Sequence, residues 1–271
     1  MAYKHIIIST EKNGRVLRVK INRPEVRNAF NEKLISEFLD VFSGAAAGKG
    51  AAYKNVRVVI LEGEGAAFCG GGDLNWMKAS LGLSKKENYE DCKHLTKMFH
   101  TMDRCPKPVV GIVHGYAIGG GVGLVSICDH VIAEAETVFS LSEVKLGLVP
   151  ACIGPFVIGK IGVSQARSLF ISGERFSSEK AKAIGLVHDM VSAAELQNRA
   201  NEVTKRILEG GPHAISIAKN LIHELSHELL RKDFAKSLDF VAKELANLRV
   251  AAEGQEGVRA FLEKRTPKWR E

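Results

Sequence analysis

The sequence lacks the features of a membrane, disulfide-bonded or nucleic-acid-binding protein. It has no run of 18 or more apolar residues, so we expect no membrane-spanning helix. Its 5 cysteines are odd in number and show no CxxC spacing, which predicts free thiols. The net charge of +7 comes from scattered Lys and Arg without a basic block, which argues against binding to nucleic acid. No secretory or transit pattern opens the chain, and we therefore expect a cytoplasmic protein.

Two nucleotide-binding patterns and one metal-binding pattern are also missing or incomplete. There is no GxxxxGK[ST] sequence, and Gly63-Glu64-Gly65 lacks the third glycine of a dinucleotide turn because Phe68 occupies that position. His223 and His227 match the HExxH pattern of zinc hydrolases, but no third ligand follows at a suitable spacing. We therefore expect neither a metal nor a separate cofactor.

The order of apolar segments predicts an α/β fold. Residues 6–9 and 16–21 have the pattern of a β-hairpin, and Asn31 can cap a helix after them. Strands and helices then alternate to about residue 190, interrupted by an Ala/Gly-rich connector at 44–52. The rest of the chain has only helical patterns, at 195–208, 214–230, 234–248 and 256–264. This predicts a core of residues 1–190 and a helical oligomerisation region of residues 191–271.

Two glycine clusters, Gly70–Gly72 and Gly119–Gly121, are the strongest functional signal in the chain. Each follows an apolar, strand-like run and precedes a helix-like stretch. Glycine allows the backbone to come close to a ligand, and the first N–H groups of a helix have no partner within it. Two such turns brought together can direct two N–H groups at one oxygen, which is the arrangement of an oxyanion hole. Close packing of a helix on a strand is the structural alternative.

Glu143 is the best candidate for a general acid or base. Its apolar flanks predict a partly desolvated carboxyl with a raised pKa. The structural alternative is a capping box in which Glu143 reaches back to the N–H of Ser140. Asp73, directly after the first glycine cluster, is expected to cap the next helix.

At these residues the chain resembles the enoyl-CoA hydratase/isomerase (crotonase) superfamily. The similarity covers nearly the whole chain and is carried by ordered motifs at residues 22–30 (NRPEVRNAF), 67–74 (AFCGGGDL), 115–121 (GYAIGGG), 142–150 (SEVKLGLVP) and 256–265 (EGVRAFLEKR). The resemblance implies a spiral core of ββα units and a C-terminal helical trimerisation region. It also implies a homotrimer, or a dimer of trimers, that acts on a coenzyme A thioester.

The resemblance also implies roles for individual residues. The backbone N–H groups of Gly72 and Gly120 would form the oxyanion hole, with Glu143 as the catalytic carboxylate. Contacts to CoA would come from Arg27, Ala29, Gly70, Gly72, Asp73, Leu74, Asn75 and Gly120. Phe261 and Lys264 would reach the CoA of a neighbouring subunit.

One departure from the family pattern leaves the reaction open. Typical hydratases of the family carry two glutamates, and the first falls where this chain has Gly123. One glutamate suffices for a Δ3,Δ2-enoyl-CoA isomerase, whereas the motifs around Asp73 and Glu143 look most like bacterial methylglutaconyl-CoA hydratases. We therefore expect a hydratase of a short branched enoyl-CoA, with an isomerase or an inactive CoA-ester-binding protein as alternatives. A substrate carboxylate would call for a cation such as Lys78 or Lys145.

Overall fold

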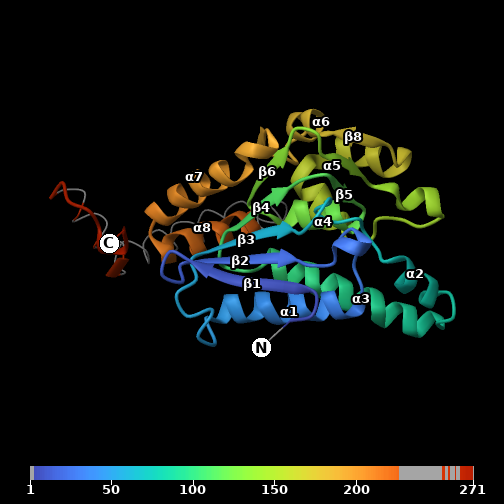
Figure 1. Ribbon diagram of the computed structural model, residues 1–271, viewed down its shortest axis with the longest axis horizontal. Coiled ribbons are helices and arrows are strands. Elements are labelled where there is room, and N and C mark those ends of the chain that lie inside the picture. Colours follow the sequence, from blue (N-terminus) through green and yellow to red (C-terminus); the bar gives the residue numbers. More distant parts are fainter. Residues whose placement is uncertain (1–2, 226–251, 254–255, 257–259, 261–262, 271) are drawn as a thin grey trace.

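A six-stranded sheet forms the centre of the molecule (Figure 1). The computed structural model describes residues 3–225, 252–253, 256, 260 and 263–270. The strand order is β1-β2-β3-β4-β6-β9, in which only β1 and β2 pair antiparallel. The bounds are β1 Ile6–Glu11, β2 Val16–Ile21, β3 Val58–Gly63, β4 Val109–Val113, β6 His130–Glu134 and β9 Asp189–Val191. The predicted hairpin is thus confirmed as β1 and β2.

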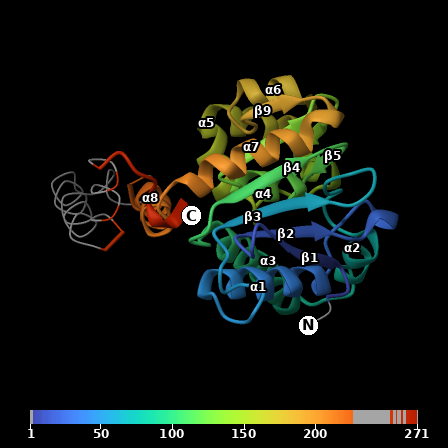
Figure 2. The ribbon, with the colours of Figure 1, turned by 60° about the vertical axis from the view of Figure 1, so that its left-hand side comes forward.

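Helices cover both faces of this sheet, which makes three layers (Figure 2). One face packs on α1 (Glu32–Ala47), α3 (Lys85–Asp103), α4 (Gly120–Ile127) and α5 (Gly154–Ser172), and the other on α7 (Leu196–Glu209). In β3, Val59 and Leu61 point to the first face, while Val58 and Ile60 point to α7. This alternation follows from the two-residue repeat of a strand, and it explains why β3 has apolar residues on both faces.

A smaller sheet of three strands has the order β5-β7-β8. It lies beside the carboxyl ends of β3 and β4, where Cys69, after β3, pairs with Ala117 of β5. It consists of β5 (Tyr116–Ile118), β7 (Val138–Ser140) and β8 (Arg175–Ser177). The short helix α2 (Leu74–Ser80) follows the first glycine cluster, and a 3-10 turn, η2 (Ser142–Leu146), follows β7. The remaining elements are η1 (Pro24–Val26), α6 (Ser178–Ala183), η3 (Ala193–Glu195), α8 (Pro212–Glu224) and η5 (Lys268–Arg270).

Capping residues predicted the starts of α1 and α2 correctly. Asn31 caps α1 by accepting a hydrogen bond from Leu34 N, and Asp73 caps α2 by accepting one from Asn75 N. The connector predicted at residues 44–52 is partly wrong, because α1 continues to Ala47 and ends at Gly48 in a left-handed conformation. The ring of Tyr53 packs against Gly44 in this helix, in the space that a Cβ would occupy, so this position favours glycine.

The last strand, β9, ends at Val191, next to the predicted boundary at residue 190. Beyond it, α7 and α8 confirm the first predicted helix and the start of the second. The predicted helix at 234–248 and most of the one at 256–264 lie outside the described residues, so the two-region division remains a prediction. Within the described part of the chain, no helix has the length and apolar character needed to cross a bilayer.

Candidate active site

The two glycine clusters and Glu143 meet at one cavity of about 380 Å³. It lies beyond the carboxyl ends of β3 and β4, the usual place for a ligand in a parallel sheet. Its walls are mostly apolar and include side chains from α2, α3, η2 and the segment before α5. The residues that line it are Phe30, Gly70, Gly71, Gly72, Leu74, Trp76, Met77, Leu95, Ile118, Gly119, Gly120, Ser142, Glu143, Leu146, Leu148, Val149, Pro150, Ala151, Cys152 and Ile153.

The first glycine turn is held by backbone contacts to Phe30. Phe30 N donates to Gly71 O at 2.7 Å, and Asp73 N donates to Phe30 O at 2.9 Å. A second backbone pairing joins Cys69 to Ala117 of β5, so this turn is fixed next to the strand that leads to the second glycine turn. The N–H groups of Gly72 and Gly120 have no hydrogen-bond partner in the described residues. Both glycines line the cavity, and neither amide is occupied by a described residue.

Glu143 enters the cavity from η2. The predicted capping box is wrong: η2 begins after Leu141 without a side-chain cap, and Glu143 does not bond to Ser140. Its Oε2 is buried and has no hydrogen-bond partner in the part of the chain described here. Its Oε1 lies 3.0 Å from where a Cβ on Gly119 would stand. Gly119 has a φ of 52°, so both its backbone conformation and the carboxyl beside it favour glycine.

Burial raises the pKa of Glu143 above the ordinary value of a glutamate. Desolvation penalises the charged form and outweighs a hydrogen bond from the backbone of Glu143, which lowers the pKa, and no cation among the described residues is paired with this carboxyl. A carboxyl with a raised pKa is a better proton acceptor when ionised than an ordinary glutamate. The structure thus confirms the raised pKa that the apolar flanks of Glu143 predict.

A buried polar cluster supports the first glycine turn from behind. Arg23 donates through Nη2 to Asp73 Oδ2 at 2.6 Å and through Nη1 to Ala29 O. Asn28 is fully buried, and its amide donates to Glu64 O and Ala67 O. Burial alone would raise the pKa of Asp73, but the hydrogen bonds from Arg23 and Asn75 N lower it. Asp73 is therefore a positioning residue, as its place before α2 predicts.

The remaining predicted CoA contacts are divided between several surfaces. Gly70 and Leu74 line the cavity, Arg27 and Gly70 line an adjoining recess, and Asn75 lies on an outer groove next to Asp73. Ala29 is buried, and its carbonyl oxygen accepts a hydrogen bond from Arg23. Lys264 is exposed in the C-terminal segment and is not part of the cavity wall, and Phe261 lies outside the described residues.

The packing around Gly123 leaves no room for the first of the two family glutamates. A Cβ at this position would lie 2.4 Å from Ile153 Cγ2 and 2.9 Å from Phe99 Cε1. Both neighbours are buried, so the space that a longer side chain would need is filled by apolar atoms. In the described wall of the cavity, Glu143 is the single carboxylate.

Only the first part of the HExxH pattern, His223 to Leu225, lies among the described residues. His223 lies 3.6 Å from Asp103, Glu224 faces Arg104, and His227 is outside the described residues. No group of three His, Cys, Asp or Glu side chains suitable for a metal occurs in the segments that could be searched. All five cysteines are free thiols, as predicted.

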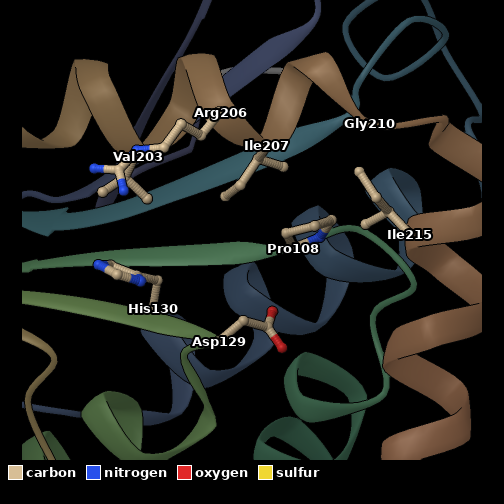
Figure 3. Close-up of a pocket in the computed structure, with 8 residues that line it drawn as sticks. All are labelled: Pro108, Asp129, His130, Val203, Arg206, Ile207, Gly210 and Ile215. Atoms are coloured by element: carbon tan, nitrogen blue, oxygen red, sulfur yellow. The ribbon is translucent and has the colours of Figure 1, made fainter. Parts of the chain in front are cut away.

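A larger cavity of about 510 Å³ lies at the amino ends of β4 and β6, beneath α7 (Figure 3). Its only carboxylate among the described residues, Asp129, accepts from Val109 N and Lys219 Nζ, both at 2.7 Å. Its His130 is bonded to Asp189 at 2.8 Å. The two described groups of this lining that could act as acid or base, Asp129 and His130, are thus both hydrogen-bonded to other parts of the fold.

Sequence reasoning missed most of the apolar wall and, in the recess next to it, Arg175. Phe30, Met77, Leu95 and Ile153 look like ordinary core residues in the sequence, and nothing in their spacing marks them as lining a site. Arg175 also carried no sequence signal, since it stands 32 residues beyond Glu143 and reaches the site only through the pairing of β8 with β7.

Known proteins resemble this chain over nearly its full length. The family described as enoyl-CoA hydratase/isomerase matches residues 11–271. The 2,3-dehydroadipyl-CoA hydratase of Escherichia coli is 30% identical, covering 97% of this chain and 97% of that protein. The short-chain-enoyl-CoA hydratase of Clostridium acetobutylicum is 30% identical, covering 94% of each chain.

The structural comparison gives the same result. The crystal structure of an enoyl-CoA hydratase from Shewanella pealeana matches with a TM-score of 0.91 at 32% identity, covering 98% of this chain and 96% of that one. The match confirms the α/β, crotonase-like fold expected from the sequence motifs. The family model spans both glycine clusters and Glu143. The chain therefore belongs to the enoyl-CoA hydratase/isomerase family of enzymes.

Proposed function

We propose that this enzyme is a hydratase that adds water across the 2,3 double bond of a short enoyl-CoA. The observation that carries the proposal is the half-buried carboxyl of Glu143, whose Oε2 has no described partner, in the same cavity as Gly72 and Gly120, whose amides have no described partner. The names of the relatives in Escherichia coli and Clostridium acetobutylicum, both hydratases, support the same reaction.

The proposed mechanism uses these three groups together. The N–H groups of Gly72 and Gly120 donate to the thioester oxygen, where negative charge develops as water adds to Cβ. Glu143 takes a proton from the attacking water, and the same carboxyl returns a proton to Cα. The hydroxyl thus ends on Cβ and the proton on Cα. By analogy with other oxyanion holes, each N–H donor contributes about 10²–10³-fold to kcat.

The packing of Gly123 against Ile153 and Phe99 favours a second candidate reaction. A Δ3,Δ2-enoyl-CoA isomerase needs one base, which removes a proton from Cα and returns it to Cγ of the same dienolate. Glu143 could perform both transfers without a second acid. The hydratase and isomerase proposals therefore share one site and differ in whether water has a place beside Glu143.

For the substrate, we propose a short branched acyl group such as that of 3-methylglutaconyl-CoA. A cavity of about 380 Å³ lined by Trp76, Met77 and Leu95 suits a small apolar or branched chain. The likeness of the motifs around Asp73 and Glu143 to methylglutaconyl-CoA hydratases supports this choice. The nucleotide of CoA is proposed to lie near Arg27 and Asn75, with Phe261 and Lys264 serving the CoA of a neighbouring subunit.

The proposed assembly is a homotrimer or a dimer of trimers, built through residues 191–271. Light scattering after gel filtration tests it directly. A mass of three or six times the 29.5 kDa chain is expected, and a monomer would contradict it.

Three substrates separate the proposed reactions. Purified protein is assayed with 3-methylglutaconyl-CoA, crotonyl-CoA and a 3-enoyl-CoA of matched length, and the products are identified by mass spectrometry. Hydration of the first two without isomerisation of the third supports the hydratase. Isomerisation without hydration supports the isomerase, and tight binding without turnover supports a CoA-ester-binding protein.

A further inference from the structure

Two of the free cysteines meet at the rim of the active-site cavity. Cys92, on α3, is exposed to solvent, whereas Cys152 is half-buried and lines the cavity. The thiol of Cys152 donates to the backbone oxygen of Cys92, with Sγ and O 3.9 Å apart, and it also interacts with the thiol of Cys92. We call these two residues the rim thiols.

The packing of α3 accounts for this contact. Cys92, Leu95 and Phe99 follow the i, i+3, i+7 spacing of one helix face. Leu95 lines the cavity together with Cys152 and Ile153, and Phe99 and Ile153 close around the same residue of α4. The chain at Cys152 and Ile153 therefore runs beside successive turns of α3, which places the rim thiols next to each other.

Cys152 belongs to a stretch of the cavity wall that has few ties to α3. We call residues 147–152 the wall segment; all but its first residue line the cavity, and the side chains of Leu148 and Val149 are exposed. Among the hydrogen bonds between described residues, the bond from Cys152 to Cys92 is the only one that joins the wall segment to α3. A covalent bond between the rim thiols would therefore add a new constraint on this wall.

The wall segment also supports Glu143. Leu148 N donates to Glu143 O at 3.1 Å, so the backbone of the proposed catalytic carboxylate is bonded to the same segment as Cys152. A disulfide holds two sulfur atoms about 2.05 Å apart, closer than two thiols in contact. Forming one here would draw Cys152 and α3 together and displace the support of Glu143.

We propose that the rim thiols are a redox modification site, in which a peroxide converts Cys92 and Cys152 to a disulfide that ties α3 to the wall segment and slows turnover. The inference goes beyond the proposed reaction, since this bond can form whichever thioester the enzyme uses.

The oxidation takes place in two steps and needs one hydrogen peroxide. The sulfur of Cys92 attacks one peroxide oxygen and the O–O bond breaks, which leaves a sulfenic acid and releases water. The sulfur of Cys152 then attacks the sulfur of Cys92, the S–O bond breaks, and the departing hydroxyl takes the proton of Cys152 as a second water. The two thiols together lose two electrons and two hydrogens.

Burial protects the other three cysteines from this reaction. Cys69, Cys105 and Cys128 are at most 1% exposed, and burial raises the pKa of each thiol, to about 12 for Cys69 and Cys128. Burial also raises the pKa of Cys152, to about 11, which leaves the exposed Cys92 as the thiol that meets the peroxide first. A small dose of peroxide should therefore modify the rim thiols alone.

The test compares the unaltered protein with Cys92→Ser, Cys152→Ser and Cys105→Ala. The last is the control, because it removes a buried thiol outside the pair. Each protein is treated with an equimolar amount of hydrogen peroxide and then with dithiothreitol. Peptide mapping by mass spectrometry identifies linked cysteines, and kcat/KM for crotonyl-CoA is measured before and after each treatment.

We expect a bond between Cys92 and Cys152 in the unaltered protein and in Cys105→Ala. In both, kcat/KM should fall by about tenfold or more and recover with dithiothreitol, because a displacement of about 1 Å near reacting groups can cost up to about 10²-fold. Neither serine variant should lose activity. Oxidation of Cys92 without this bond, a bond between Cys92 residues of two chains, equal inactivation of the serine variants, or a bond that leaves kcat/KM unchanged would each overturn the proposal.

Failure of the proposed function can be told apart from failure of this inference. The linked peptide is identified by mass and does not depend on catalysis. If the reduced protein turns over no thioester, titration calorimetry with crotonyl-CoA replaces kcat/KM, and oxidation should increase Kd by about tenfold. An unchanged Kd after complete formation of the bond would contradict control of the cavity by the rim thiols.

Discussion

Glu143 is half-buried beside Gly119, and its buried Oε2 has no partner among the described residues, a costly arrangement for a side chain that serves only the fold. We predict that Glu143→Gln lowers kcat by at least about 10²-fold, because general acid–base catalysis is lost. The unfolding temperature should not fall, since the ionised carboxyl is already disfavoured by burial. Near-normal kcat would show that Glu143 does not transfer the proton.

The raised pKa of Glu143 gives a second prediction, on pH. As a base, Glu143 must be ionised, so kcat should increase with pH through a pKa above the ordinary glutamate value of about 4.3. For stability the sign is opposite, because a carboxyl whose pKa is raised by folding favours the folded state at low pH and loses that contribution as pH rises. An acidic limb at or below the ordinary value in a kcat–pH profile would contradict this reading.

Gly123 gives a prediction about packing. An added methyl group would lie 2.4 Å from Ile153 Cγ2, so Gly123→Ala should lower the free energy of unfolding by about 1–3 kcal/mol. Gly154→Ala is the matched control, since the nearest atom to its added Cβ would be 3.8 Å away on Phe170. Equal stability of the two variants in urea unfolding would contradict the close packing described for α4.

Residue-scale features were predictable where the signal is local. The glycine clusters, Asp73 as a cap and Glu143 with its apolar flanks could all be identified from neighbouring residues. The capping box considered for Glu143 is absent because η2 begins two residues after Ser140. A 3-10 turn of this kind has no distinct sequence pattern. The neighbours of Gly123 could not be predicted, since Ile153 lies 30 residues further along the chain and meets it only by helix packing.

At the scale of elements, the buried pair of Arg23 and Asp73 connects the loop before α1 to the start of α2. We predict that Asp73→Asn lowers the free energy of unfolding by about 3 kcal/mol, because Arg23 would keep a buried charge without its anionic partner. The exposed pair of Lys93 and Glu90 provides the control, in which Glu90→Gln should change stability by less than about 1 kcal/mol. Equal losses in the two variants would contradict a supporting role for Arg23 and Asp73.

The pKa of Asp73 is lowered in the folded protein, so its contribution is present above the unfolded value of about 3.9 and is lost as pH falls through the folded value. The difference between Asp73→Asn and the unaltered protein should therefore shrink in acid.

Most elements could be predicted because hydrophobic periodicity and helix caps depend on residues close together in the sequence. The hairpin, the buried strands β3 and β4 and the start of α1 follow from such signals. The end of α1 was misplaced because Gly44 was taken as a break, whereas the helix continues through three alanines to Ala47 and ends at Gly48. The pairing of β8 with β7, which carries Arg175 to the recess, joins segments more than 30 residues apart and leaves no local trace.

At the scale of the whole molecule, the site exists only because three separate segments meet. Gly72 follows β3, Gly120 follows β5 and Glu143 follows β7, and the proposed mechanism needs all three. The family motifs predicted that these three residues lie at one site. Hydrophobic periodicity alone predicted the helices and strands but not their arrangement in space. The trimeric assembly and the roles of Phe261 and Lys264 remain predictions.

Exchange of the Cα hydrogens of butyryl-CoA in D₂O tests the assembled site most directly. This saturated thioester cannot be hydrated or isomerised, so deuterium at Cα reports on proton removal by Glu143 and on stabilisation of the enolate by the two amides. We predict exchange catalysed by the unaltered protein and slowed by about 10²-fold or more in Glu143→Gln, followed by NMR. Exchange equally fast in both proteins would contradict the account.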